Sequence, residues 1–177
     1  MAKLVLTAIG PDQPGLVSAL SEAVIEHGGN WLTSELARLA GSFAGIVLIE
    51  VPDHQVDALS AAVRRLGDQG LLDVEISAAA PQQEPQDASE PMRLSLLGQD
   101  RPGIVREVTR ALATHGVTIV EFSSDIGEAP QSGGRLFKAE ASVLVPTGVS
   151  EGDVRASLEA IAGEMMVDLV VASAEPS

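Results

Sequence analysis

Two short turns carry the residue types that could bind a small polar ligand. The first, Gly10 to Gly15, reads GPDQPG, and the second, Gly98 to Gly103, reads GQDRPG. Each lies between an apolar, strand-like run and the start of a helical pattern. Proline is tolerated at the first position of a helix, and glycine lets the backbone approach a ligand closely. The free amides of Gly15, Leu16 and Val17 at such a helix start could hold a carboxylate.

A purely structural interpretation of these residues also stays open. Asp12 and Asp100 could be helix-start residues whose carboxylates accept hydrogen bonds from their own helix amides. Arg101 could pair with a ligand carboxylate or be solvated in its turn. Trp31, the only tryptophan, could line a ligand cleft or fill an interface.

Both turns belong to an internal repeat, and this repeat decides the domain organisation of the chain. A shift of 88 residues superposes Gly10, Asp12, Pro14, Gly15, Val17, Ala23, His27 and Gly28 on Gly98, Asp100, Pro102, Gly103, Val105, Ala111, His115 and Gly116. Between the copies, residues 80–91 read APQQEPQDASEP, which is too polar and proline-rich to bury a core. The sequence therefore predicts domains at 1–79 and 92–174, joined by a linker at 80–91.

Hydrophobic periodicity predicts the same element order in each copy. In the first copy we expect strands at 4–9, 31–39, 43–51 and 74–78, and helices from 16 to 27 and over 55–66. In the second copy we expect strands at 92–97, 117–126, 136–145 and 166–172, helices at 103–115 and 151–162, and a hairpin loop at 127–134. Met165 and Met166 are expected to open the last strand. The order βαββαβ predicts an α+β fold of two ferredoxin-like units, each a four-stranded antiparallel sheet with two helices on one face.

Composition excludes several classes of function. Aromatic residues make up 2% of the chain and the net charge is −14, which disfavours binding to nucleic acid or to an anionic membrane. There is no cysteine, the three histidines have no metal-ligand spacing, and no G-x-S-x-G motif occurs. We therefore expect a soluble cytoplasmic protein that is not an enzyme and uses no metal or cofactor.

The D-x-P-G turn after a strand, the amphipathic helix and the HGGN run at residues 27–30 resemble the ACT domain, a small-molecule-sensing module. The resemblance covers residues 4–78 and 92–173, and the opening LVLTAIGPDQPGLVSALSEAV is similar to the glycine cleavage system transcriptional repressor family. It implies an amino-acid-sensing regulator that acts on transcription through a partner protein rather than by contacting DNA. Two alternatives remain: a detached regulatory subunit of a metabolic enzyme, or an assembly module whose ligand sites have decayed.

The resemblance also implies where a small amino acid, glycine or serine, would bind. It places the ligand where two ACT units meet, between the helix-start turn and the beginning of the second strand. The implied site residues are Asp12, Gln13, Pro14, Gly15, Leu16, Asn30 and Trp31 in the first copy and Asp100, Arg101, Pro102, Gly103, Ile104, Thr118 and Ile119 in the second. Thr118 replaces the amide of Asn30, which favours the first site. Because each sheet leaves one face and its edges uncovered, we expect a homo-oligomer, such as a homodimer.

Overall fold

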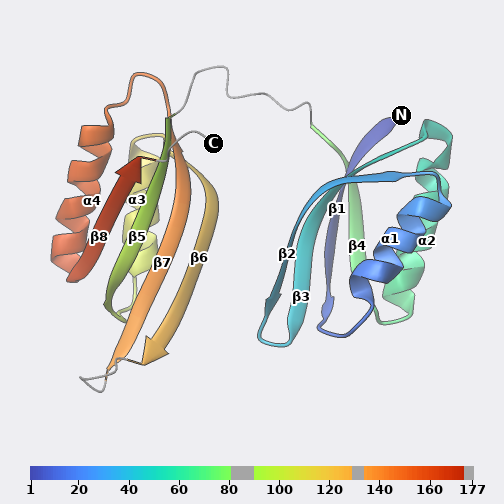
Figure 1. The fold of residues 1–177 in the computed structure, drawn as a ribbon, viewed down its shortest axis with the longest axis horizontal. Coiled ribbons are helices and arrows are strands. Elements are labelled where there is room, and N and C mark those ends of the chain that lie inside the picture. Colours follow the sequence, from blue (N-terminus) through green and yellow to red (C-terminus); the bar gives the residue numbers. More distant parts are fainter. Residues whose placement is uncertain (81–89, 129–133, 174–177) are drawn as a thin grey trace. The chain divides into compact units, whose positions relative to one another are not determined.

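A computed structural model describes residues 1–80, 90–128 and 134–173, and the chain divides into two compact units, Met1–Gln82 and Gln83–Ser177. We call these the N-terminal and C-terminal units (Figure 1). Each contains a four-stranded antiparallel sheet and the element order βαββαβ. The expected fold of two tandem ferredoxin-like units is therefore confirmed.

The N-terminal unit packs two α-helices on one face of its sheet (Figure 1). Its elements are β1 (Ala2–Pro11), α1 (Leu16–Glu26), β2 (Asn30–Leu39), β3 (Ser42–Val51), a 3₁₀ turn (Asp53–Gln55), α2 (Val56–Asp68) and β4 (Asp73–Ala78). The strand order is β2-β3-β1-β4. The central strands are therefore β1 and β3, and β2 and β4 form the two edges.

The C-terminal unit repeats this arrangement with the strand order β6-β7-β5-β8. Its elements are β5 (Glu90–Gln99), α3 (Ile104–Thr114), β6 (Thr118–Glu128), β7 (Arg135–Val145), α4 (Glu151–Met165) and β8 (Val167–Ser173). Strand β5 thus starts two residues before the expected strand, within the expected linker, and β6 extends into the expected hairpin loop. The rest of that linker and of that loop, residues 81–89 and 129–133, lies outside the described residues.

Aliphatic side chains from the sheet and both helices form one core in each unit. Along β1, Leu4, Leu6 and Ala8 are buried while the residues between them face outward, as the two-residue period of a strand requires. Leu20 of α1 and Leu59 of α2 close over them in the same cluster. The C-terminal unit has its own cluster built in the same way.

Strand β2 does not follow the simple alternation that its sequence predicts. Its pairing with β3 shifts between Trp31 and Thr33, so that Trp31 lies opposite Ile49 and Thr33 lies opposite Leu48. A one-residue bulge moves the following side chains to the other face. Trp31 therefore faces the helices and packs partly buried against the core. Strand β6 has the same irregularity after Ile119.

The expectation that Met165 and Met166 open the last strand is wrong. Helix α4 runs through Met165, and Met166 follows as its C-cap with φ 54°, in the left-handed region. A left-handed residue ends a helix because it turns the chain away from the helix axis. Strand β8 therefore begins at Val167.

Candidate functional site

The first D-x-P-G turn leads directly from β1 into α1. Gly15 is the N-cap of α1, with φ 92° and ψ −2°, and no side chain caps the helix. A side chain rarely adopts this left-handed backbone, so glycine is required by conformation. Among the described residues, apart from its two chain neighbours, no heavy atom lies within 4 Å of where a Cβ would be. The turn thus exposes the start of α1.

Asp12 is held by the neighbouring hairpin instead of capping its own helix. Its amide donates to the carbonyl of Gly41 at 2.9 Å, in the turn between β2 and β3. Its carboxylate Oδ2 accepts a hydrogen bond from Nε of Arg38 at 2.8 Å and a second from Nη2 of the same side chain. The interpretation of Asp12 as the cap of α1 is therefore wrong.

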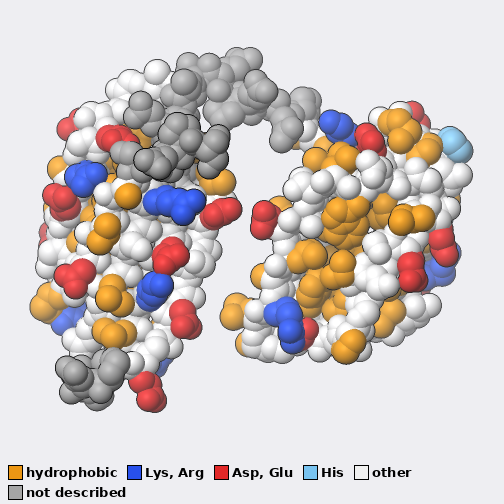
Figure 2. Space-filling model, viewed as in Figure 1, with side chains coloured by type: hydrophobic (Ala, Val, Ile, Leu, Met, Phe, Trp, Pro, Cys, Tyr) orange, Lys and Arg blue, Asp and Glu red, His pale blue; other side chains and the backbone are white. Residues whose placement is uncertain are grey.

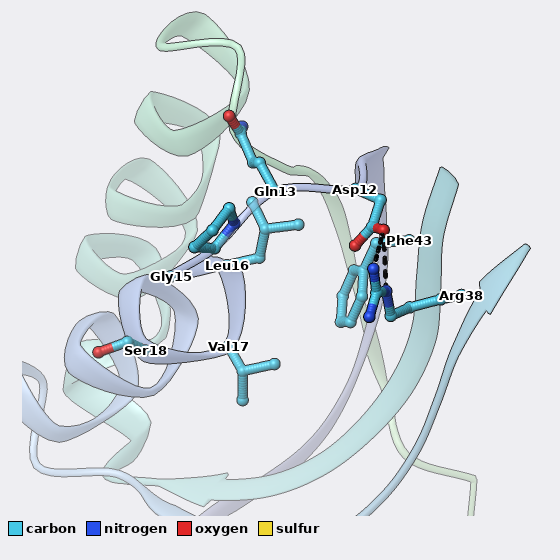
Figure 3. A pocket seen from close by; sticks show the side chains of 9 residues that line it. Asp12, Gln13, Gly15, Leu16, Val17, Ser18, Arg38 and Phe43 are labelled. Atoms are coloured by element: carbon cyan, nitrogen blue, oxygen red, sulfur yellow. Dashed lines mark hydrogen bonds and ion pairs between the residues drawn. The ribbon is translucent and has the colours of Figure 1, made fainter. Parts of the chain in front are cut away.

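These groups surround an open pocket of about 450 Å³ (Figure 3). Its lining residues are Asp12, Gln13, Pro14, Gly15, Leu16, Val17, Ser18, Arg38 and Phe43. Phe43 is buried, whereas the side chain of Arg38 is 74% exposed and that of Asp12 is 22% exposed. Hydrogen bonding to Asp12 raises the pKa of the Arg38 guanidinium. The pocket therefore offers one fixed positive charge, one carboxylate, the uncapped helix start and an apolar wall.

Gln13 points away from the ion pair in Figure 3. Its Nε2 lies 3.4 Å from the carbonyl oxygen of Gly70, in the connection between α2 and β4. In the C-terminal unit Arg101 takes the equivalent place, and its Nη2 lies 3.8 Å from Sδ of Met166, between α4 and β8. Arg101 is half-buried, so it is not the fully solvated arginine of the structural interpretation, and its role as a partner of a ligand carboxylate stays a prediction. In each unit the residue after the aspartate, Gln13 or Arg101, therefore contacts the connection between the second helix and the last strand of that unit.

The second turn keeps the backbone of the first but changes its ion pair. Gly103 is the N-cap of α3 with φ 97° and no side-chain cap. The amide of Asp100 donates to the carbonyl of Arg135 at 2.8 Å. The carboxylate of Asp100 lies 3.4 Å from Nε of Arg135, the first residue of β7. In the N-terminal unit the arginine of the ion pair, Arg38, instead lies near the end of β2. Asp100 therefore does not cap its helix either.

Within one unit, the two halves of the expected site lie at opposite ends of the sheet. Asn30, at the start of β2, lies opposite Glu50, which in turn lies opposite Lys3 on β1. Asp12 follows β1 nine residues further on, a distance of roughly 30 Å at a rise of about 3.3 Å per residue. The Nδ2 of Asn30 is 3.5 Å from Oε1 of Glu50. Asn30 and Trp31 therefore do not reach the turn of their own unit.

The C-terminal unit separates its expected residues in the same way. Thr118 lies opposite Leu144, which pairs with Pro91 at the start of β5, whereas Asp100 follows the other end of that strand. Ile119 is half-buried and packs against the core. Pro102 is exposed and Ile104 is buried beneath the helix start.

Sequence reasoning missed three residues that line the pocket, and it considered only the backbone amide of Val17. Ser18 was hidden in the helical pattern of α1, and Arg38 and Phe43 are distant in sequence from the turn. One signal was available, because a phenylalanine stands early in the third strand of both copies, Phe43 and Phe137. The position of Arg38 gave no such signal, because the bulge in β2 puts its side chain on the opposite face from the one that simple alternation from Trp31 would give.

Two further expectations concern metal binding and membrane-spanning helices. Across residues 1–80, 90–128 and 134–173, no three His, Cys, Asp or Glu side chains are grouped to hold a metal ion. In the same part of the chain no helix has the length and apolar character needed to cross a membrane.

His27 Nδ1 lies 2.7 Å from the carbonyl oxygen of Ala23, and His115 Nε2 lies 2.8 Å from Oγ of Ser157. These two rings have structural partners at or near the ends of their helices.

The chain is similar to curated proteins along most of its length. It is 29% identical to phosphoserine phosphatase SerB2 of Mycobacterium tuberculosis over 95% of this chain, but it spans only 40% of the length of that protein. It is 23% identical to the glycine cleavage system transcriptional repressor of Escherichia coli, over 92% of this chain and 85% of the repressor.

A solved structure and a family model extend these similarities. The crystal structure of an unknown protein from Galdieria sulphuraria superposes with a TM-score of 0.82, at 27% identity, covering 98% of this chain and 99% of that one. The family model described as the ACT domain matches residues 2–77 and 90–125, which is more than half of the chain. This protein therefore belongs to the ACT domain family.

Proposed function

We propose that this protein is an amino-acid-sensing regulator whose ligand binds at the turn of the N-terminal unit. The observation that carries the proposal is the adjacency of Asp12, Arg38 and the uncapped start of α1 around one pocket. An α-amino acid carries a carboxylate and an ammonium group on neighbouring atoms. A site with one charge of each sign and a helix N-terminus is suited to that pair of groups.

In the proposed binding, the ion pair between Asp12 and Arg38 is replaced by two ion pairs with the ligand. The ligand carboxylate accepts hydrogen bonds from the amides near Gly15 and from the guanidinium of Arg38. The ligand ammonium donates hydrogen bonds to the carboxylate of Asp12. Val17 and Phe43 form an apolar wall beside the ligand, and the proposed ligand is a small amino acid, glycine or serine.

The affinity of such a site has an upper bound. Glycine has five non-hydrogen atoms, and about 1.5 kcal/mol per atom limits its binding free energy to about 7.5 kcal/mol. The dissociation constant is then no tighter than the micromolar range. Metabolite sensing requires no more than this.

We further propose that a second ACT unit completes the site. A ligand that contacts both a turn and the start of a second strand requires two units, because one unit separates them by roughly 30 Å. Strand β2 is a ten-residue edge with Leu32, Leu36 and Leu39 exposed. Exposed edges of this length favour pairing, which supports a homo-oligomer. Sedimentation that gave only monomer at high concentration would contradict pairing between copies.

The proposed output is regulation of transcription through a partner protein in the cytoplasm, with no catalytic role for this chain. The name of the Escherichia coli repressor supports a role in transcription, and the charge of −14 favours a protein partner over direct DNA contact. The second candidate is a detached regulatory subunit of a metabolic enzyme. It is favoured by the match to less than half of a phosphatase chain.

Two measurements test these proposals. Calorimetric titration of the whole chain with each of the twenty amino acids should give heat for at least one small amino acid, and no heat for any would contradict sensing. Affinity purification with and without that amino acid should then separate the two candidates. A DNA-binding regulator would support the first, and an enzyme would support the second.

A further inference from the structure

The sheet of the N-terminal unit has an apolar outer face, opposite its helices. On β1 and β3 the side chains between the buried ones point to this side. We define the N-terminal outer face by Val5, Thr7, Ile9, Ala44, Ile46 and Leu48. Register joins Val5 to Leu48, Thr7 to Ile46 and Ile9 to Ala44 across the two strands. Ile9 is 55% exposed and Ile46 is 51% exposed, so the patch is continuous and open to contact.

The C-terminal unit shows that this fold does not require an apolar outer face. Matching the two registers through the pairs Leu4–Ile49 and Met92–Val143 gives the equivalent positions. Val5, Ala44, Ile46 and Leu48 correspond to Arg93, Lys138, Glu140 and Ser142, while Thr7 and Ile9 correspond to Ser95 and Leu97. Nζ of Lys138 lies 2.9 Å from Oε1 of Glu140. Figure 2 shows acidic and basic side chains mixed on this sheet face of the C-terminal unit.

Carboxylates flank the apolar centre of the N-terminal outer face. Glu35 of β2 lies opposite Ile46, while Asp73 and Glu75 of β4 lie opposite Ile9 and Thr7. None of these three carboxylates forms an ion pair within the described part of the chain. Lys3 and Glu50 face each other at one end of the patch. The face therefore combines apolar surface with unpaired negative charge on both sides.

We propose that the N-terminal outer face docks a protein whose contact surface is apolar at its centre and flanked by lysine or arginine. Charge selects this occupant over a second copy of the chain. Two copies placed face to face would bring like-charged rims together, and such contacts are unfavourable. A basic rim on the partner would instead neutralise the carboxylates on both edges.

The size of the face suits a transient complex. Three ten-residue strands and the six-residue β4, at about 3.4 Å per residue and about 4.8 Å per strand, give an area of about 590 Å². A standard stable interface buries about 800 Å² on each partner. A regulated complex that forms and dissociates fits an area slightly below that size.

This inference rests on the proposed regulatory function, because it names the surface through which a regulator would reach its partner. The two remain separable by experiment. Ala44 and Ile46 point to the face opposite Phe43, which lines the ligand pocket. Substitutions at these two positions can therefore disrupt docking while leaving the pocket intact.

The first experiment is photocrosslinking of the full chain in its own cells. A p-benzoylphenylalanine residue replaces Ile46, and in a matched protein it replaces Glu140 at the equivalent position of the other unit. We expect a crosslinked partner from position 46 but not from position 140, with lysine or arginine beside the crosslinked peptide. No crosslink at position 46, an equal crosslink at position 140, or crosslinks only to this same chain would overturn the proposal.

The second experiment measures binding of the purified partner to defined variants. Ala44→Lys combined with Ile46→Glu copies the Lys138–Glu140 arrangement, which this fold already accommodates. We expect at least tenfold weaker binding by this variant. Glu35→Gln with Glu75→Gln should weaken binding and reduce its salt dependence. Unchanged affinity in either variant would overturn the proposal.

Two controls keep the result interpretable. Circular dichroism and thermal unfolding test whether the double variant is folded, and Ile46→Thr is used if it is not. Amino-acid calorimetry on the same variants tests the ligand site separately. Loss of docking with intact amino-acid binding supports the inference. Docking without any amino-acid binding would refute sensing while leaving the docking surface in place.

Discussion

Asp12 and Arg38 are 26 residues apart in the chain and are joined by two hydrogen bonds to one carboxylate oxygen. This ion pair ties the turn before α1 to the end of β2. The amide of Asp12 also donates a hydrogen bond to the carbonyl of Gly41. The ion pair and this hydrogen bond together fix the start of α1 against the hairpin of β2 and β3. A ligand that competes for either charge therefore acts on both elements at once.

Replacing Arg38 should weaken amino-acid binding more than it weakens the fold. Arg38→Gln removes the positive charge proposed to hold the ligand carboxylate, and we expect at least tenfold weaker binding by calorimetry. Exposed ion pairs contribute little to stability, so thermal unfolding should barely change. Arg106→Gln is the matched control, because among the described residues Arg106 pairs only with the adjacent Glu107. Equal losses in the two variants would contradict a specific role for Arg38.

Gly15→Ala should destabilise the N-terminal unit through backbone conformation alone. At φ 92° with no neighbour within 4 Å, the added methyl group meets no atom but strains the chain. We expect a loss of about 1 to 2 kcal/mol in the free energy of unfolding, measured with urea. Gly163→Ala is the control, since Gly163 lies within α4 in open space. It should raise stability by about 0.5 to 1 kcal/mol, and a loss there would count against this explanation.

Leu6→Ala should be among the more damaging single substitutions in the N-terminal unit. The Leu6 side chain is fully buried on β1, between both helices and the sheet. Removing it leaves a cavity, and we expect a loss of about 2 to 5 kcal/mol. Ile9→Ala on the exposed side of the same strand should cost far less. A similar loss for the two would mean that the outer face is buried in solution.

The pKa of Glu140 should lie below that of an ordinary glutamate, because Lys138 donates a hydrogen bond to its carboxylate. A carboxyl group with a lowered pKa stabilises the fold above its unfolded pKa, and this contribution is lost as the pH falls through the folded value. Carbon-detected NMR titration measures the pKa directly. Lys138→Met should raise it, and no change would mean that the pair does not form in solution.

The fold could be predicted because each element carries its own local signal. Leu4, Leu6 and Ala8 alternate on β1, and proline and glycine mark the turn that ends the strand. The internal repeat then assigned the same order to the second copy. Met166 escaped this reasoning, because a methionine in the left-handed region has no sequence signature and its conformation depends on packing at the end of α4.

The site could be predicted only in part, because its residues converge through long-range pairing. The backbone role of Gly15 follows from the motif, whereas Arg38 reaches Asp12 only through strand register and a bulge after Trp31. The ends of a sheet are likewise set by strand pairing. For this reason the distance between Asn30 and the turn could not be read from the sequence.

The most direct test of amino-acid sensing is a proton–nitrogen NMR titration of the full chain with the amino acid that gives heat in calorimetry. The amides of Leu16, Val17 and Ser18, at the start of α1, should shift and saturate at micromolar to millimolar ligand. The same titration of Arg38→Gln should require at least tenfold more ligand. If no amide between Asp12 and Ser18 shifts with any of the twenty amino acids, the N-terminal turn is not the sensing site.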